Sequence, residues 1–149
     1  MKIEYNNLYT HFVFTTLNRV PVIPEKNRER IEKYITGIVK NSGCYLYAIY
    51  ANPEHVHFLV SRSPDKDEED LATTIADSSA RFINENQLCV GLFQWQQTCS
   101  AFSVSKKDVS KVCLYIETQK ERHAKQSYND EYAKFLKHYQ QTLCKMENE

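Results

Sequence analysis

Alternating apolar and polar residues predict four short strands. Residues 8–17 and 44–51 are rich in aromatic and β-branched side chains, as strands usually are. In residues 55–60, Val56, Phe58 and Val60 alternate with the histidine-bearing positions, and residues 93–104 end in a similar run. A turn signal, Asn52-Pro53, separates the second strand from the third, so these two are expected to be antiparallel neighbours.

Helical spacing of apolar residues predicts four helices between and after these strands. The first covers residues 24–41, and Pro24 suits its entry. The second covers residues 67–85, where a run of acidic residues favours the first turn. A third is expected over residues 105–125, opened by a Ser105–Asp108 capping pattern, and a terminal amphipathic helix over residues 127–143.

The order of these elements indicates the fold class. Strand-helix-strand-strand-helix-strand is the order of a ferredoxin-like (RRM-like) α+β domain. It has an antiparallel sheet with helices on one face, and the chain adds further C-terminal helices. A length of 149 residues suits one domain, so we expect a single domain over residues 1–149.

Composition says more about the cellular compartment of the protein than about any reaction that it catalyses. The chain has 19 basic and 19 acidic residues, so no global charge attracts it to nucleic acid. The five cysteines are widely spaced and form no Cys-x-x-Cys pair, which is typical of a reducing compartment. No apolar run is long enough to span a bilayer, and no signal segment is recognisable. We therefore expect a cytoplasmic protein that does not enter the membrane.

Two histidines in the third strand form the first candidate site. His55 and His57 are two residues apart, so their side chains share one face of the strand while Val56 points into the core. Two neutral imidazoles side by side can bind a divalent metal. A chain with five histidines can contain this pattern by chance. The interpretation as a metal site therefore depends on both imidazoles projecting from the open face of a central strand. We interpret His11 as an ordinary strand residue and His138 as a surface residue.

The third predicted helix carries the second candidate site. Tyr115 and Gln119 are four residues apart, hence neighbours on one helical face, and Lys111 and Arg122 are close to that face. Tyr115 is a candidate nucleophile, although a tyrosine beside an apolar stripe is more often a residue at the edge of the core. The apolar stripe itself consists of Val109, Val112, Cys113 and Ile116.

The same region holds a local excess of basic residues. Between positions 106 and 125 there are six basic residues and three acidic ones. This excess is either an ordinary solvated helix face or a surface that binds a nucleic-acid strand. The candidate phosphate-binding residues are Lys106, Lys107, Lys111 and Arg122.

Taken in order, these motifs resemble a known family. The matching segments run from His55-Val56-His57 through Trp95-Gln96 and 101–105 to Tyr115-Ile116-x-x-Gln119 and Glu131-Tyr132-x-x-Phe135-Leu136. They are similar to the small single-tyrosine HUH transposases of bacterial insertion sequences, where HUH stands for histidine, hydrophobic residue, histidine. The departures are Glu54 where the family often has aspartate, Thr98-Cys99 for a Gly-Tyr pair, and Arg122-His123 for a histidine pair.

The resemblance implies a specific chemistry. His55, His57 and Gln119 would bind magnesium or manganese, and Tyr115 would attack DNA to form a 5′-phosphotyrosine link. The substrate implied is single-stranded DNA with hairpins near the ends of the element. A homodimer is implied as well, in which the tyrosine helix of one subunit can serve the histidine pair of the other.

Two other functions remain open at this point. One is a non-catalytic module that binds single-stranded nucleic acid through aromatic stacking on the same fold. The other is a metal-dependent enzyme acting on a small molecule, for which Glu54 is the only carboxylate close to the histidines in sequence.

Overall fold

The computed structural model describes residues 1–123, 130, 133–134 and 137, and of Arg122 and His123 it describes only the backbone. The predicted terminal helix therefore falls outside the described residues, except for a few isolated positions. The chain forms two compact units, Met1–Glu117 and Thr118–Glu149. The single domain predicted over residues 1–149 stays a prediction.

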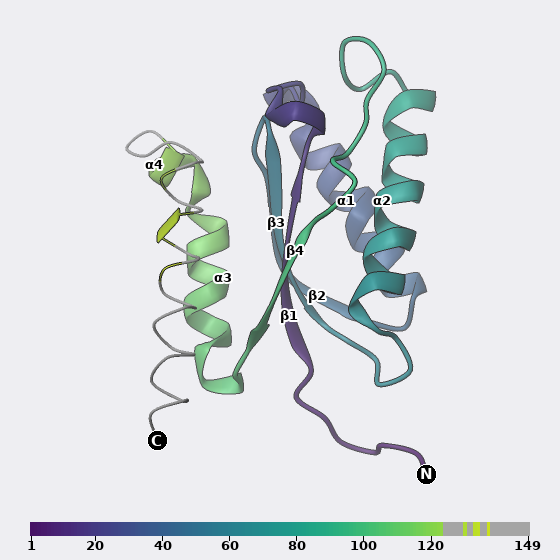
Figure 1. Ribbon diagram of the computed structural model, residues 1–149, viewed down its shortest axis with the longest axis vertical. Helices are drawn as coiled ribbons and strands as arrows, with labels where there is room; N and C mark the ends of the chain where they lie inside the picture. Colours follow the sequence, from purple (N-terminus) through teal and green to yellow (C-terminus); the bar gives the residue numbers. More distant parts are fainter. Residues whose placement is uncertain (124–129, 131–132, 135–136, 138–149) are drawn as a thin grey trace. The chain divides into compact units, whose positions relative to one another are not determined.

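The first unit is built on a four-stranded antiparallel sheet (Figure 1). Its strands are β1 (Tyr9–Thr15), β2 (Tyr45–Ala51), β3 (His55–Ser61) and β4 (Ser100–Val104), in the spatial order β2-β3-β1-β4. β1 and β3 are the two central strands, and β2 and β3 are adjacent and antiparallel, as the short turn predicts. The ferredoxin-like α+β fold is confirmed.

Two helices cover one face of the sheet (Figure 1). Helix α1 (Glu25–Asn41) begins directly after Pro24, whose fixed φ suits a helix entry. Helix α2 (Glu68–Glu85) is capped by Asp67, whose carboxylate accepts a hydrogen bond from the Asp70 amide at 2.8 Å. Both helices confirm the ranges predicted from the sequence.

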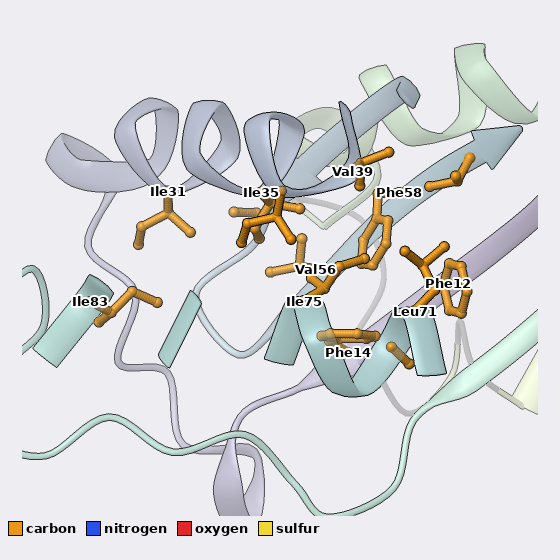
Figure 2. Close-up of a cluster of buried hydrophobic side chains, with 14 of the residues drawn as sticks. Phe12, Phe14, Ile31, Ile35, Val39, Val56, Phe58, Leu71, Ile75 and Ile83 are labelled. Atoms are coloured by element: carbon orange, nitrogen blue, oxygen red, sulfur yellow. The ribbon is translucent and has the colours of Figure 1, made fainter. Parts of the chain in front are cut away.

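The main hydrophobic core fills the space between these helices and the sheet (Figure 2). Phe58 of β3 lies at its centre, stacked on Phe12 at 5.2 Å and edge-on to Phe14 at 5.0 Å between ring centroids. Alternation along the strands explains this, because Val56, Phe58 and Val60 all point to the helix-covered face. The helices contribute Ile31, Ile35, Val39, Leu71, Ile75 and Ile83.

A third helix, α3 (Val109–Glu117), packs on the opposite face, against β2 and β3. A short 3-10 turn, η2 (Lys106–Asp108), leads into it. The Ser105 hydroxyl donates to the Asp108 carboxylate at 2.9 Å, so the predicted capping pattern is a contact between two side chains. A smaller core lies under α3, formed by Ala48, Leu59, Val104 and Ile116 with the partly buried Val109, Val112 and Cys113. The predicted apolar stripe is confirmed.

Two predicted boundaries are wrong. The third helix does not continue to residue 125: α3 ends at Glu117, and a separate short helix, α4 (Gln119–His123), follows Thr118. The fourth strand is also shorter than predicted, because only Ser100–Val104 pairs along β1. Trp95 instead makes one isolated bridge with Thr16, while its indole donates to the Ser79 hydroxyl at 2.9 Å.

Candidate active site

His55 and His57 lie on the face of the sheet that α3 covers. Because they alternate with Val56 and Phe58, they point away from the main core. Their ring centroids are 4.9 Å apart. The expectation of an open face is wrong: the two histidines are only 0% and 3% exposed. The reason is that α3 packs across β2 and β3 on this side.

Hydrogen bonds on both ring nitrogens fix the orientation of His55. Its Nδ1 lies 2.9 Å from the Glu54 carboxylate, which is the natural acceptor for an Nδ1–H group. The Asn52 amide nitrogen lies 3.3 Å from Nε2 and can donate to it. In this pattern Nδ1 is the donor and Nε2 the acceptor. The sequence identified Glu54 as a departure from the family pattern and as the carboxylate closest to the histidines, whereas here it orients His55.

His11 of β1 is part of the same cluster. Its Nε2 lies 2.9 Å from Nδ1 of His57, and its side chain is fully buried. Burial, reinforced by the nearby His57, holds the pKa of His11 well below its usual value, so His11 is neutral at physiological pH. His11 lies in a strand, as predicted, but the interpretation of it as an ordinary strand residue without a histidine partner is wrong. Strand pairing places it diagonally across from His57, and this pairing is not visible in a motif search along one strand.

Tyr115 of α3 contacts this histidine cluster on the face of the sheet that α3 covers. Its ring centroid is 5.6 Å from that of His57, nearly perpendicular to it, and 6.3 Å from that of His11. The ring is half-buried at the edge of the smaller core. The structure thus brings Tyr115 and the histidine pair together within one chain, in the unit Met1–Glu117.

The family model described as "Transposase IS200 like" matches residues 4–119. The chain belongs to the IS200-like transposase family. No curated protein sequence matches this transposase.

Two solved structures share the fold of this IS200-like transposase. One is a protein from Deinococcus radiodurans R1 named as a candidate transposase, with a TM-score of 0.62 and 21% identity over 80% of this chain and 96% of that one. The other is a REP-associated tyrosine transposase bound to a REP hairpin, with a TM-score of 0.61 and 15% identity over 83% of this chain and 72% of that one. In the described part of the transposase, no helix has the length and apolarity that crossing a membrane requires.

The imidazole pair of this transposase fits a divalent metal ion. Nδ1 of each ring is hydrogen-bonded to a neighbouring side chain, His55 to Glu54 and His57 to His11. Metal-binding histidines commonly have such a bond on one ring nitrogen and bind the metal through the other. On His55, the Nε2 lone pair that accepts from Asn52 is the one that a metal ion would take.

The structure says less about the remaining candidate residues. Gln119 begins α4 and belongs to the second unit, so its role as a third ligand stays a prediction. Lys106, Lys107 and Lys111 are exposed on η2 and α3. The side chain of Arg122 and the whole of His138 fall outside the described part of the chain.

Proposed function

We propose that this transposase cleaves and rejoins single-stranded DNA at the ends of an insertion sequence through a 5′-phosphotyrosine intermediate on Tyr115. The observation that carries the proposal is the contact between the rings of Tyr115 and His57, at 5.6 Å between centroids. A tyrosine beside a buried histidine pair combines a nucleophile with a metal-binding site. The family supports the same reading, because its members are transposases.

The reaction exchanges one phosphodiester for another. The Tyr115 oxygen forms a bond to the scissile phosphorus as the bond from phosphorus to the 3′-oxygen breaks. The phenol proton leaves, and the departing 3′-oxygen takes up a proton to become a 3′-hydroxyl. Attack by a second 3′-hydroxyl then reverses the step on a new strand and releases Tyr115. The broken end stays covalently attached throughout, which serves rejoining better than hydrolysis would.

His55 and His57 are proposed to hold Mg²⁺ or Mn²⁺, with Gln119 as the third ligand. When bound, the ion supplies positive charge that polarises the scissile phosphate toward attack. Glu54 supports the site by orienting His55 through the 2.9 Å contact. Free tyrosine has a pKa of about 10, so Tyr115 also needs a positive or basic neighbour to lose its proton at neutral pH.

The DNA partner is proposed to be a single strand with a hairpin near the cleavage site. One of the two solved structures above has a REP hairpin bound to a transposase of the same fold. Exposed Lys106, Lys107 and Lys111 can contact phosphates, and Arg122 is a further candidate.

We also propose that the protein acts in the cytoplasm as a homodimer. The contact between Tyr115 and His57 of the same chain supports an active site within one subunit, and exchange of tyrosine helices between subunits is the alternative.

The test is covalent capture of DNA by the full-length protein. A labelled hairpin-bearing single strand is incubated with the protein and Mn²⁺, and the products are separated on a denaturing gel. We expect a protein–DNA adduct that Tyr115→Phe abolishes while hairpin binding persists. Tyr34→Phe is the matched control, because Tyr34 stacks on Phe82 at 3.8 Å against the main core, on the other face of the sheet.

Two outcomes would contradict the proposal. An adduct that persists in Tyr115→Phe would move the nucleophile elsewhere, Tyr128 being the next candidate by position. Salt-sensitive binding with no metal requirement and no covalent product would instead indicate a non-catalytic binding module.

A further inference from the structure

The buried contact between His11 and His57 has so far been described without saying which of the two rings donates the proton. The two residues come from adjacent central strands, where His11 pairs with Leu59 and His57 pairs with Val13. Their side chains therefore meet on the diagonal, with His11 Nε2 2.9 Å from His57 Nδ1. Both rings are buried, so the bond does not compete with bulk water.

Only one arrangement of protons lets this bond coexist with metal binding. A neutral imidazole has one N–H donor and one acceptor nitrogen. If His11 donates from Nε2, Nδ1 of His57 is the acceptor and Nε2 of His57 carries the proton, which blocks it as a ligand. If His57 donates from Nδ1, its Nε2 has a lone pair for a metal ion, and His11 carries its own proton on Nδ1.

We infer that His11 is a positioning residue, which accepts the Nδ1–H of His57 and so presents Nε2 of that ring to the metal ion. The inference rests on the proposed function and assigns a new residue to the same site. His11 acts through His57 and is not itself a ligand, because its Nε2 is occupied by the bond to that ring.

The environment of His55 supports the same arrangement. There the Glu54 carboxylate lies 2.9 Å from Nδ1, and a carboxylate can only accept, so His55 has its proton on Nδ1. His11 would do for His57 what Glu54 does for His55, with a neutral acceptor in place of a charged one. A neutral partner suits this position because the His11 ring is fully buried, where a charge would be costly.

His11 also restricts the space around the nucleophile. Its ring lies edge-on to Tyr115 at 6.3 Å and next to Phe102 at 6.1 Å between centroids. One side chain therefore contacts both the histidine that binds the metal and the tyrosine that attacks. His11→Gln keeps an acceptor for His57 but removes the ring that lies against Tyr115, so it separates these two contacts.

The experiment is a long-range ¹H–¹⁵N NMR correlation on histidine rings in the metal-free, full-length protein. In the wild type we expect His57 to have its proton on Nδ1. His11→Gln keeps an acceptor oxygen and should preserve this tautomer, whereas His11→Phe removes the acceptor and should move the proton to Nε2. Thr10→Val is the matched control, since Thr10 is buried on the same strand and accepts from Arg62 at 3.0 Å.

Titration with Mn²⁺ by calorimetry gives the second readout. His11→Phe should weaken binding on the order of 10- to 100-fold, as loss of a partner that orients a ligand commonly does. His11→Gln should restore most of the affinity, and Thr10→Val should match the wild type. Equal affinity in His11→Phe and the wild type, or a wild-type His57 protonated on Nε2, would overturn the inference.

Failure of the proposed function is distinguishable from failure of this inference. If the wild type binds no Mn²⁺ at all, the metal-dependent function is wrong. The metal-free spectrum still decides the tautomer of His57 in that case. If Mn²⁺ binds but the tautomer does not depend on an acceptor at position 11, only the role of His11 is refuted.

Discussion

The two faces of the sheet are buried by different means. The face under α1 and α2 is filled by aromatic and aliphatic side chains that pack by shape. The face under α3 has a smaller apolar core beside three buried histidines, which hydrogen bonds orient, and the half-buried Tyr115. Apolar packing tolerates substitutions of similar volume, whereas each buried imidazole depends on a specific partner. The first face should thus set the stability of the unit, and the second its chemistry.

The largest effect should come from removing a histidine on the α3 face. His57→Ala deletes a proposed ligand and the partner of His11, so we expect loss of Mn²⁺-dependent cleavage in the adduct assay. Far-UV circular dichroism should still report a folded protein, because the main core is untouched. An active His57→Ala variant would show that the two faces do not divide their roles in this way.

The next largest effect should come from the other face. Phe58→Ala empties a fully buried site between Phe12 and Phe14, and should lower the free energy of unfolding by about 3–5 kcal/mol. Urea denaturation measures this loss. Cleavage per folded molecule should be retained, since Phe58 points away from the histidines; a folded but inactive variant would contradict the comparison.

A smaller effect is expected at the entry of α2. Asp67→Ala removes the carboxylate that accepts from the Asp70 amide, and should cost about 1 kcal/mol of stability. Asp67→Asn keeps an acceptor oxygen and should recover most of that loss. Thermal unfolding of the two variants, compared with the wild type, measures the difference, and a cost shared equally by both would point to the charge instead.

The smallest effect should come from Glu32, a polar residue on the face that α1 and α2 cover. Glu32 of α1 accepts from the Ala51 amide at 2.9 Å and from Arg28, yet burial is the larger influence and raises its pKa. Glu32→Gln keeps an acceptor for Ala51, and Arg28 keeps its bond to Glu25, so we expect the free energy of unfolding to change by about 1 kcal/mol or less. A large loss would mean that this face, too, depends on a directed charge pair.

Local patterns predicted most of the fold. Alternation in β3 and the apolar spacing in α1 come directly from side-chain periodicity, and Pro24 and Asp67 mark helix entries by their own chemistry. The break after Glu117 was missed because no proline or glycine marks it. A helical pattern that continues across Thr118 conceals the end of α3.

The candidate site was only partly predictable for a different reason. His55 and His57 are separated by one residue in the sequence, so one motif reveals both. His11 is 46 residues from His57, and only the strand register brings them into contact. The bond between Glu54 and His55 was also missed, since a neighbouring acid is ordinarily free to face solvent.

The three-residue turn between β2 and β3 fixes which side chains reach the site. Its backbone is bonded at every position: the Asn52 amide donates to the His55 carbonyl at 2.8 Å, and the Pro53 and Glu54 carbonyls accept from Ile23 and Thr16 at 3.0 and 2.9 Å. Inserting one residue here and shifting β3 by one position would turn every side chain of that strand over. The imidazoles would then point into the main hydrophobic core, and Phe58 would lie on the face that α3 covers. The length of this turn therefore decides which face of the sheet the histidines occupy.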